Sequence, residues 1–433
     1  MLPIILAQSA ARHRSKTAVV CRDVSVTYGE LLRRIDAKAS ACDYGGRITA
    51  LRAHPDIDFL TDYFAIHRSG GTAAPLAKDL PATLFEERAR TFAELLPPAD
   101  AADVLYTTGT TGRQKGVVVS RKAILANTEN LVEAQRYSSD VTFVAAGALN
   151  HLGTLSKLFA SFYVGATVVL LEGMKDMSAF FDAIEAAEGP VATFLVPASI
   201  RMLLSYGRER LASLADKIAF IETGAAPPAR ADMLALRTLL PRTRLYNTYA
   251  STEAGIVATH DYSVGDCIAA CVGRPMRHSS IAIGADGSVR CSGATLMTAY
   301  LGDATSTHAV LHDGVLTTSD RGMIDGEGRL HMLGRDDDVI NVGGYKVAPT
   351  EVEDAARSFE GVTDCVCIAA RHPVAGTIPK LLIVSETPVD RRALALFLRE
   401  RLEAHQVPML YEQTTHVFRN ANGKIDRKKY AET

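Results

Sequence analysis

A loop rich in glycine and threonine carries the residue types that bind phosphate. Residues 104–120 read V-L-Y-T-T-G-T-T-G-R-Q-K-G-V-V-V-S, so hydroxyl groups, glycines and a lysine stand between two apolar segments. Glycine lets backbone N–H groups approach phosphate oxygens, hydroxyl groups add hydrogen-bond donors, and lysine adds positive charge. The pattern predicts a strand, a polyphosphate-binding loop and a second strand, after which Ser120 caps a helix. The expected phosphate ligands are Thr108, Gly109, Thr110, Thr111, Gly112 and Lys115.

The spacing in this loop excludes two common phosphate-binding motifs. No Gly-Lys pair is followed by Ser or Thr, as a Walker A motif requires, and no Gly-x-Gly-x-x-Gly dinucleotide fingerprint is present. Considered alone, the loop has a structural alternative, which is a glycine-rich hairpin without a ligand.

The elements that must position the loop follow an α/β pattern. Apolar runs such as 219–222 alternate with helical patterns such as 230–240, and from about Asp261 short strands are separated by glycine turns. We therefore expect a mixed α/β fold. A large N-terminal α/β domain with a β-rich subdomain spans residues 1–336, and a small α+β C-terminal domain spans 337–433.

The composition favours small-molecule partners. The 433 residues are 47% hydrophobic and 22% charged, and the formal net charge is -2. This balance gives no electrostatic footprint for nucleic acid or an anionic membrane. The apolar run at 2–7 is too short for a secretory signal, and no apolar stretch reaches membrane-spanning length. We expect a cytoplasmic protein with no nucleic-acid and no membrane partner.

The seven cysteines indicate reduced thiols without a catalytic role. Neither Cys267 with Cys271 nor Cys365 with Cys367 has the spacing of a zinc site. The last two alternate with apolar residues, which is typical of a buried strand face.

Together with later segments, the loop resembles the phosphate-binding signature of the AMP-binding, or ANL, superfamily of acyl-CoA synthetases, adenylation domains and luciferases. The other matching segments follow in the family's order up to residue 428. They are 224–227 (G-A-A-P), 247–253 (N-T-Y-A-S-T-E), 318–320 (T-S-D), 334–337 (G-R-D-D), 340–353 and 420–427 (N-A-N-G-K-I-D-R). The resemblance implies an enzyme that uses ATP and magnesium to activate a small-molecule carboxylic acid as its acyl-AMP. A thiol then takes the acyl group.

The resemblance assigns nucleotide contacts to the segment that begins at Asn247. It implies that Tyr249 stacks on adenine and that Thr252 bonds the α-phosphate. Glu253 would hold magnesium, a cation that prefers oxygen ligands and retains waters. Read without this context, the segment is a solvated turn.

Two further segments resemble those that hold the nucleoside. Gly224, Ala225 and Ala226 correspond to a flat backbone segment that covers the other face of adenine. Asp320 would accept both ribose hydroxyls, because a carboxylate offers two acceptor oxygens, and Arg335 would support the same sugar. Without the family context, a turn and a surface ion pair explain these residues.

The C-terminal segments resemble those that act in the two steps of the reaction. Lys424 corresponds to the adenylation lysine, whose ammonium group bridges the attacking carboxylate and the α-phosphate. Gly343 and Gly344 correspond to glycines that line the channel for a pantetheine thiol. Relatives rotate the small domain between the steps about the position of Asp337, so the resemblance implies a mobile lid with its hinge there.

The acyl group is expected near His151, a candidate gate, because residues 150–155 resemble the family segment where the acyl pocket meets the thiol channel. A buried structural histidine is an equally good explanation from sequence alone. The segment lacks an aspartate to anchor an amino group, which favours a plain or aromatic acid over an amino acid.

Three hypotheses follow. The leading one is an acid–thiol ligase with coenzyme A as acceptor. The second is a stand-alone adenylation enzyme that loads the phosphopantetheine arm of an acyl or peptidyl carrier protein. The third is a non-catalytic nucleotide-binding protein, which Lys424 and Glu253 disfavour. Gln114, Ala250 and Ser319 replace a usual proline and two usual glycines, so we expect altered nucleotide affinity.

Overall fold

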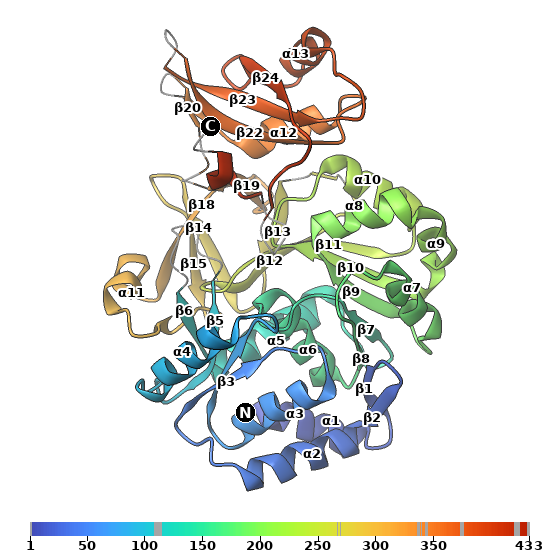
Figure 1. Ribbon diagram of the computed structural model, residues 1–433, viewed down its shortest axis with the longest axis vertical. Coiled ribbons are helices and arrows are strands. Elements are labelled where there is room, and N and C mark those ends of the chain that lie inside the picture. Colours follow the sequence, from blue (N-terminus) through green and yellow to red (C-terminus); the bar gives the residue numbers. More distant parts are fainter. Residues whose placement is uncertain are drawn as a thin grey trace.

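The computed structural model describes residues 2–107, 115–265, 267–268, 270–335, 338, 340–342, 345–372, 376–419 and 425–430. Within these ranges the strands form a large sheet and three smaller ones, and helices cover the sheets (Figure 1). The mixed α/β fold expected from the sequence is confirmed.

One half of the large sheet is parallel. Its apolar strands are buried on both faces, as is usual when helices cover a parallel sheet. Along β7 and the residue that follows it, Phe143 and Ala145 face one core, and Val144 and Ala146 face the other. From the sheet edge inward the strands of this half are β2 (Val24–Thr27), β1 (Thr17–Cys21), β8 (Thr167–Leu170), β7 (Thr142–Ala145), β9 (Val191–Leu195), β10 (Ile218–Gly224) and β11 (Arg244–Ser251), with only β2 antiparallel to its neighbour.

Beyond β11 the large sheet becomes antiparallel. The strands are joined by the glycine turns that the sequence predicts, including the turn at 284–287. In sheet order they are β12 (Gly255–Asp261), β13 (Cys271–Pro275), β19 (Leu330–Arg335), β18 (Val315–Ile324), β15 (Ser288–Gly293) and β14 (Ser279–Ile283), and β17 (Leu311–His312) pairs with β18.

A second sheet holds the strands on either side of the predicted phosphate-binding loop. Its order is β16 (Ala299–Tyr300), β6 (Gly116–Ser120), β5 (Ala101–Tyr106), β4 (Thr72–Leu76) and β3 (Ile48–Arg52). The two strands predicted around the loop are confirmed as the antiparallel pair β5 and β6. Ser120 accepts a hydrogen bond from Ala123 N at 3.0 Å and caps α5 (Arg121–Gln135), as predicted.

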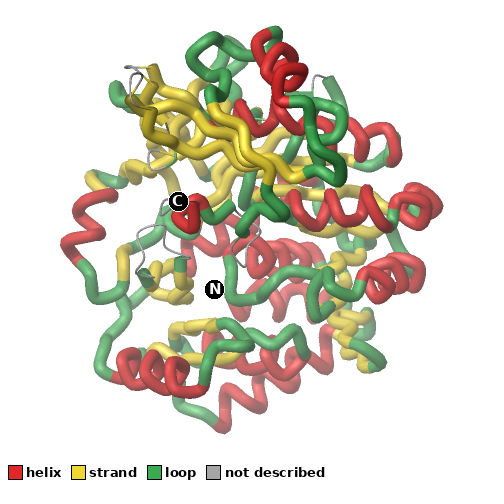
Figure 2. The backbone as a smooth tube through the Cα atoms, turned by 45° about the horizontal axis from the view of Figure 1, so that its top comes forward, coloured by secondary structure: helices red, strands yellow, loops and turns green. Residues whose placement is uncertain are grey.

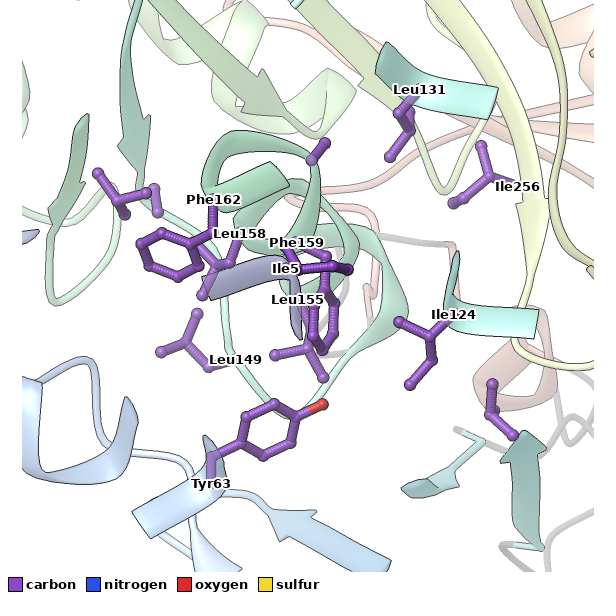
Figure 3. Close-up of a cluster of buried hydrophobic side chains, with 14 of the residues drawn as sticks. Ile5, Tyr63, Ile124, Leu131, Leu149, Leu155, Leu158, Phe159, Phe162 and Ile256 are labelled. Atoms are coloured by element: carbon purple, nitrogen blue, oxygen red, sulfur yellow. The ribbon is translucent and has the colours of Figure 1, made fainter. Parts of the chain in front are cut away.

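Helices α5 and α6 (Leu152–Val164) are central, since α5 contacts both sheets and α6 packs against α5 and the large sheet. Their apolar residues meet Ile5 and Tyr63 from the N-terminal helices in one buried cluster (Figure 3). The helices packed mainly around this core and the second sheet are α1 (Leu2–Arg12), α2 (Tyr28–Ala41), α3 (Ile57–Arg68) and α4 (Ala82–Ala93). The others of the large domain are α7 (Met177–Ala186), α8 (Pro197–Tyr206), α9 (Arg208–Ser213), α10 (Arg230–Leu239), α11 (Ala304–Val310) and the short 3₁₀ helix Ala215–Lys217.

The C-terminal part of the chain has a core of its own, and Figure 2 shows its strands crossing the top of the molecule. Arg201 on α8 joins it to the large domain through an ion pair with Asp364, Nη1 to Oδ1, at 3.3 Å. Its elements are β20 (Ile340–Val342), β21 (Tyr345–Val347), α12 (Pro349–Arg357), β22 (Asp364–His372), β23 (Gly376–Val384), α13 (Arg391–Arg399), β24 (Leu410–Gln413) and the 3₁₀ helix Arg427–Tyr430. In the part of the chain described, no helix combines the length and apolarity needed to cross a membrane.

The cysteines allow a direct test of the packing. All seven are free thiols, and Cys42 is partly exposed whereas the others are buried. Burial raises the pKa of Cys365 to about 12 and that of Cys367 well above its ordinary value. We expect Cys42 alone to react rapidly with Ellman's reagent in the native protein, and all the thiols to react after unfolding. Fast native labelling of Cys365 or Cys367, located by mass spectrometry, would contradict the packing of β22.

Candidate nucleotide and acyl site

The expected site lies where the large sheet changes from parallel to antiparallel. The parallel strands β9, β10 and β11 end side by side, and ligands of open α/β sheets bind beyond the carboxyl ends of such strands. Gly224, Ala225 and Ala226 follow from β10, and Thr252 and Glu253 form the turn after β11. The topology therefore brings two of the predicted segments to one edge.

The backbone after β10 is held close to β11. A Cβ atom added to Gly224 would lie 2.8 Å from the carbonyl oxygen of Thr248, so only glycine fits there. Ala225 has a φ of 67°, which is left-handed and costs about 1 kcal/mol or more for a residue other than glycine. These two constraints fix the backbone of the small-residue segment that the sequence predicts.

Asp320 on β18 receives hydrogen bonds from two of the predicted nucleoside ligands. Tyr249 donates its hydroxyl to Oδ2 at 2.7 Å, and Arg335 donates Nε–H to Oδ1 at 2.8 Å. Asp320 and Arg335 are directly opposite each other in the β18–β19 register. Burial, with the charge of Asp320 added, raises the pKa of Tyr249 well above its ordinary value, so the phenol stays a donor. Each carboxylate oxygen retains acceptor capacity, which a ribose diol requires.

Glu253 and Lys115 both contact Tyr300, a residue that the sequence alone did not identify as part of the site. Tyr300 on β16 donates its hydroxyl to Glu253 Oε1 at 3.0 Å, and Lys115 Nζ lies 4.6 Å from the centroid of the same ring. The backbone N–H of Met297 also donates to the carbonyl of Glu253 at 2.8 Å. Lys115, at the end of the predicted phosphate-binding loop, and the expected magnesium ligand Glu253 therefore lie near the same ring. The local sequence around Tyr300 carries no signal for this, because only the pairing of β16 with β6 brings the residue there.

The chain is similar to known proteins in sequence and in fold. A family model described as AMP-binding enzyme matches residues 83–301. The chain belongs to the AMP-binding enzyme family. It is 27% identical to a feruloyl-CoA synthase of Amycolatopsis sp. over 94% of each chain. It is 30% identical to an indoleacetate–CoA ligase of Aromatoleum aromaticum over 74% of this chain and 65% of that one.

The structure of ATP-bound MatB from Rhodopseudomonas palustris has the same fold as this AMP-binding enzyme. The TM-score is 0.87 at 20% sequence identity, over 100% of this chain and 99% of that one. The predicted family and the predicted reaction class, an ATP-dependent acid–thiol ligase that forms an acyl-AMP, are thereby confirmed.

The side chains around Glu253 fit a magnesium ion that takes most of its ligands from the bound ATP and from water. In the described part of the AMP-binding enzyme, no group of three or more His, Cys, Asp or Glu side chains converges. Magnesium commonly takes one or two protein carboxylates and completes its shell with phosphate oxygens and water. Glu253 supplies one carboxylate beside Lys115, so a metal held there would draw its other ligands from ATP and solvent.

The expected acyl gate begins helix α6. His151 is the N-cap residue, and its carbonyl accepts from Leu155 N at 3.0 Å. A Cβ atom added to the nearby Gly153 would lie 3.2 Å from the ring of Phe194, and one added to Gly224 would lie 3.6 Å from it. Phe194 on β9 thus joins the start of α6 to the end of β10.

Asn247 on β11 links this strand to β13. The residue is buried, and its side-chain amide donates to the carbonyl of Cys271 at 2.8 Å.

The remaining sequence-predicted residues lie outside the described residues: Thr108, Gly109, Thr110, Thr111, Gly112, Asp337, Gly343, Gly344 and Lys424.

Proposed function

We propose that this AMP-binding enzyme uses ATP and magnesium to activate an aromatic monocarboxylic acid and then transfers the acyl group to coenzyme A. The observation that carries the proposal is the contact of Tyr300 with both Glu253 and Lys115, at the sheet edge where the backbone after β10 also lies. It brings the expected ligands of phosphate and metal together. Two relatives are named for aromatic acids, ferulate and indoleacetate.

In the proposed first step the substrate carboxylate attacks the α-phosphorus of ATP and pyrophosphate leaves. Tyr300 orients Glu253, and a magnesium ion held there would offset the negative charge of the phosphates. Lys115 places its ammonium group beside the same ring, and we assign it to the outer phosphates on the family resemblance. Asp320 fixes the ribose, which holds the α-phosphorus in line with the acid.

In the proposed second step the thiol of coenzyme A attacks the carbonyl carbon of the mixed anhydride and AMP leaves. We assign Gly343 and Gly344 to the thiol channel and Asp337 to the hinge, on the resemblance alone. The phosphopantetheine arm of a carrier protein presents the same thiol and is the alternative acceptor. An enzyme that consumes ATP and coenzyme A would act in the cytoplasm, where both are abundant.

A pyrophosphate-release screen tests the proposal. The enzyme is assayed with short aliphatic, long-chain, aromatic and amino acids, with and without coenzyme A, and with a carrier protein that bears a free phosphopantetheine thiol in its place. We expect release that depends on an aromatic acid and is abolished by EDTA, together with a coenzyme A thioester detected by mass spectrometry. Release with amino acids alone, or with no acid of the panel, would refute the proposal.

A further inference from the structure

One aspartate of the C-terminal domain binds arginines from both domains. Asp364, the first residue of β22, pairs through Oδ1 with Nη1 of Arg201 on α8 of the large domain at 3.3 Å. Its other oxygen, Oδ2, accepts from Nη2 of Arg419 at 2.8 Å. Arg419 immediately precedes residues 420–424, the segment that contains Lys424. A single carboxylate therefore connects the large domain to the residue at which the Lys424 segment begins.

The two ends of the Lys424 segment are both fixed, although the segment itself lies outside the described residues. Arg419 and Ile425 pair as an antiparallel bridge, so the ends lie side by side. Beyond this bridge, Arg427 donates Nη2–H to Oε1 of Glu353 on α12 at 2.6 Å. Charge-assisted hydrogen bonds of this kind are about twice as strong as neutral ones. Acidic residues of the C-terminal domain therefore hold the segment at both ends.

A chain of contacts leads from the end of the Lys424 segment to the expected nucleoside site. Arg427 Nε lies 3.9 Å from Oδ1 of Asp338. The backbone N–H of Asp338 donates to the carbonyl of Arg335 at 3.0 Å, and Arg335 binds Asp320, the expected ribose ligand. The domain arrangement in this structure therefore brings the end of the segment towards the nucleotide, as the first step of the reaction requires.

The contact between Arg201 and Asp364 is partly enclosed and keeps its charges. The two side chains are 27% and 20% exposed, so salt screens the pair less than it screens a pair on the open surface. Burial raises the pKa of Asp364, but the arginines around it, Arg419 foremost, outweigh this effect and hold the pKa below its ordinary value. Arg201 also pairs with Asp232 on α10 at 3.3 Å. The large domain thus orients the guanidinium group towards the C-terminal domain.

We propose that Asp364 is a positioning residue for acyl-AMP formation, because its pair with Arg201 stabilises the domain arrangement in which the Lys424 segment faces the nucleotide. The inference rests on the proposed function, in which Lys424 acts in the first step and the second step needs a rotated C-terminal domain. Rotation separates Asp364 from Arg201, whereas Arg419 belongs to the same domain as Asp364 and moves with it. The pair therefore favours the first step over the second. The ratio of the two rates follows the equilibrium between the two arrangements.

Separate measurement of the two steps in Arg201→Ala tests the inference. The first step is single-turnover pyrophosphate release with ATP and the aromatic acid that the screen finds to be fastest, with ferulic and indoleacetic acids as the first probes. The second step is thioester formation from the corresponding prepared acyl-AMP and coenzyme A. We expect the ratio of the first rate to the second to fall about tenfold, because a charged contact is lost from one arrangement only. The ratio responds whichever arrangement predominates, since the shift lowers the first rate or raises the second.

Further variants show whether the effect passes through this ion pair. Arg201→Lys retains the charge without the planar guanidinium group, so we expect the ratio to fall only about threefold. Asp364→Asn should lower the ratio at least as much as Arg201→Ala, and the double variant should lower it no further than Asp364→Asn alone. Arg201→Ala leaves Asp364 with Arg357 and Arg419 as partners, so its fold should be retained, and it decides the inference even if Asp364→Asn does not fold.

Arg210→Ala is the matched control. Arg210 on α9 forms ion pairs within the large domain, with Glu185 at 3.0 Å and with Asp182, so its loss should leave the ratio unchanged. An unchanged or increased ratio in Arg201→Ala, or an equal loss in both steps, would overturn the inference. Failure of the proposed function has a different signature, since the wild-type enzyme would then carry out neither step.

Discussion

Replacement of Lys424 by alanine is expected to lower the rate of acid-dependent pyrophosphate release by about 100-fold to 1,000-fold, with the fold and ATP binding retained. The resemblance of residues 420–427 to the C-terminal family motif places the adenylation lysine at this position. An ammonium group that bridges the attacking carboxylate and the α-phosphate stabilises charge that develops only in the transition state, so the loss falls on kcat. Single-turnover pyrophosphate release, ATP titration and thermal unfolding measure the three quantities.

Two controls define what a loss of activity in Lys424→Ala means. Lys429→Ala removes another lysine of the same C-terminal segment, which contacts the ring of Phe418 at 5.1 Å, and should leave the rate nearly unchanged. Supplied acyl-AMP should still react with coenzyme A in Lys424→Ala, because the thiol step does not need the adenylation lysine. Unchanged pyrophosphate release in Lys424→Ala would refute its assignment.

The sequence predicted those parts of the molecule that depend on local patterns. The strands around the phosphate loop, the cap at Ser120 and the glycine turns after Asp261 all follow from residue types at fixed spacing, and all are present. The proximity of Tyr249, Asp320 and Arg335 was predictable only from the family resemblance. Nothing in the residues between them shows that β18 and β19 lie in register at this point.

Other features depend on long-range pairing and were not predicted. Tyr300 reaches Glu253 because β16 pairs with β6, which is far away in the sequence. Lys157, which forms a buried ion pair with Glu222, had a local signal, since it is a lone cation in an otherwise apolar stretch of α6, but the position of Glu222 opposite it had none. A buried charge without a visible partner in the sequence is therefore a reason to search the structure for one.

The N-terminal helices were also not predicted, because no motif of the sequence identifies them. The family resemblance leaves the first hundred residues unmatched, and the family model also begins only at residue 83. Nevertheless Tyr63 on α3 packs against Phe159 on α6, with ring centroids 6.0 Å apart. The N-terminal helices thus support the helix that carries Lys157 and begins after His151. Packing of this kind tolerates many apolar sequences of similar volume, so it leaves no motif to recognise.

Replacement of Asp320 by alanine is expected to raise the KM for ATP by about 100-fold or more, with a smaller change in kcat. Two hydrogen bonds from the ribose to a charged acceptor are worth about 1.5–3 kcal/mol each, and each 1.4 kcal/mol is a tenfold change in affinity. The variant also releases Tyr249 and Arg335 from the carboxylate that orients them. Asp286→Ala removes a carboxylate that caps the turn between β14 and β15, and should leave the KM for ATP unchanged.

Deoxynucleotides distinguish a direct ribose contact of Asp320 from an indirect effect. If its carboxylate accepts both hydroxyls, 2′-deoxy-ATP and 3′-deoxy-ATP should each bind the wild-type enzyme about tenfold more weakly than ATP. In Asp320→Ala the same deoxynucleotides should bind about as well as ATP, because the hydroxyls have already lost their acceptor. An equal loss in both proteins would show that Asp320 acts only by holding Tyr249 and Arg335. The coupling between Asp320 and each ribose hydroxyl therefore decides whether Asp320 binds the ribose directly, as the family resemblance implies.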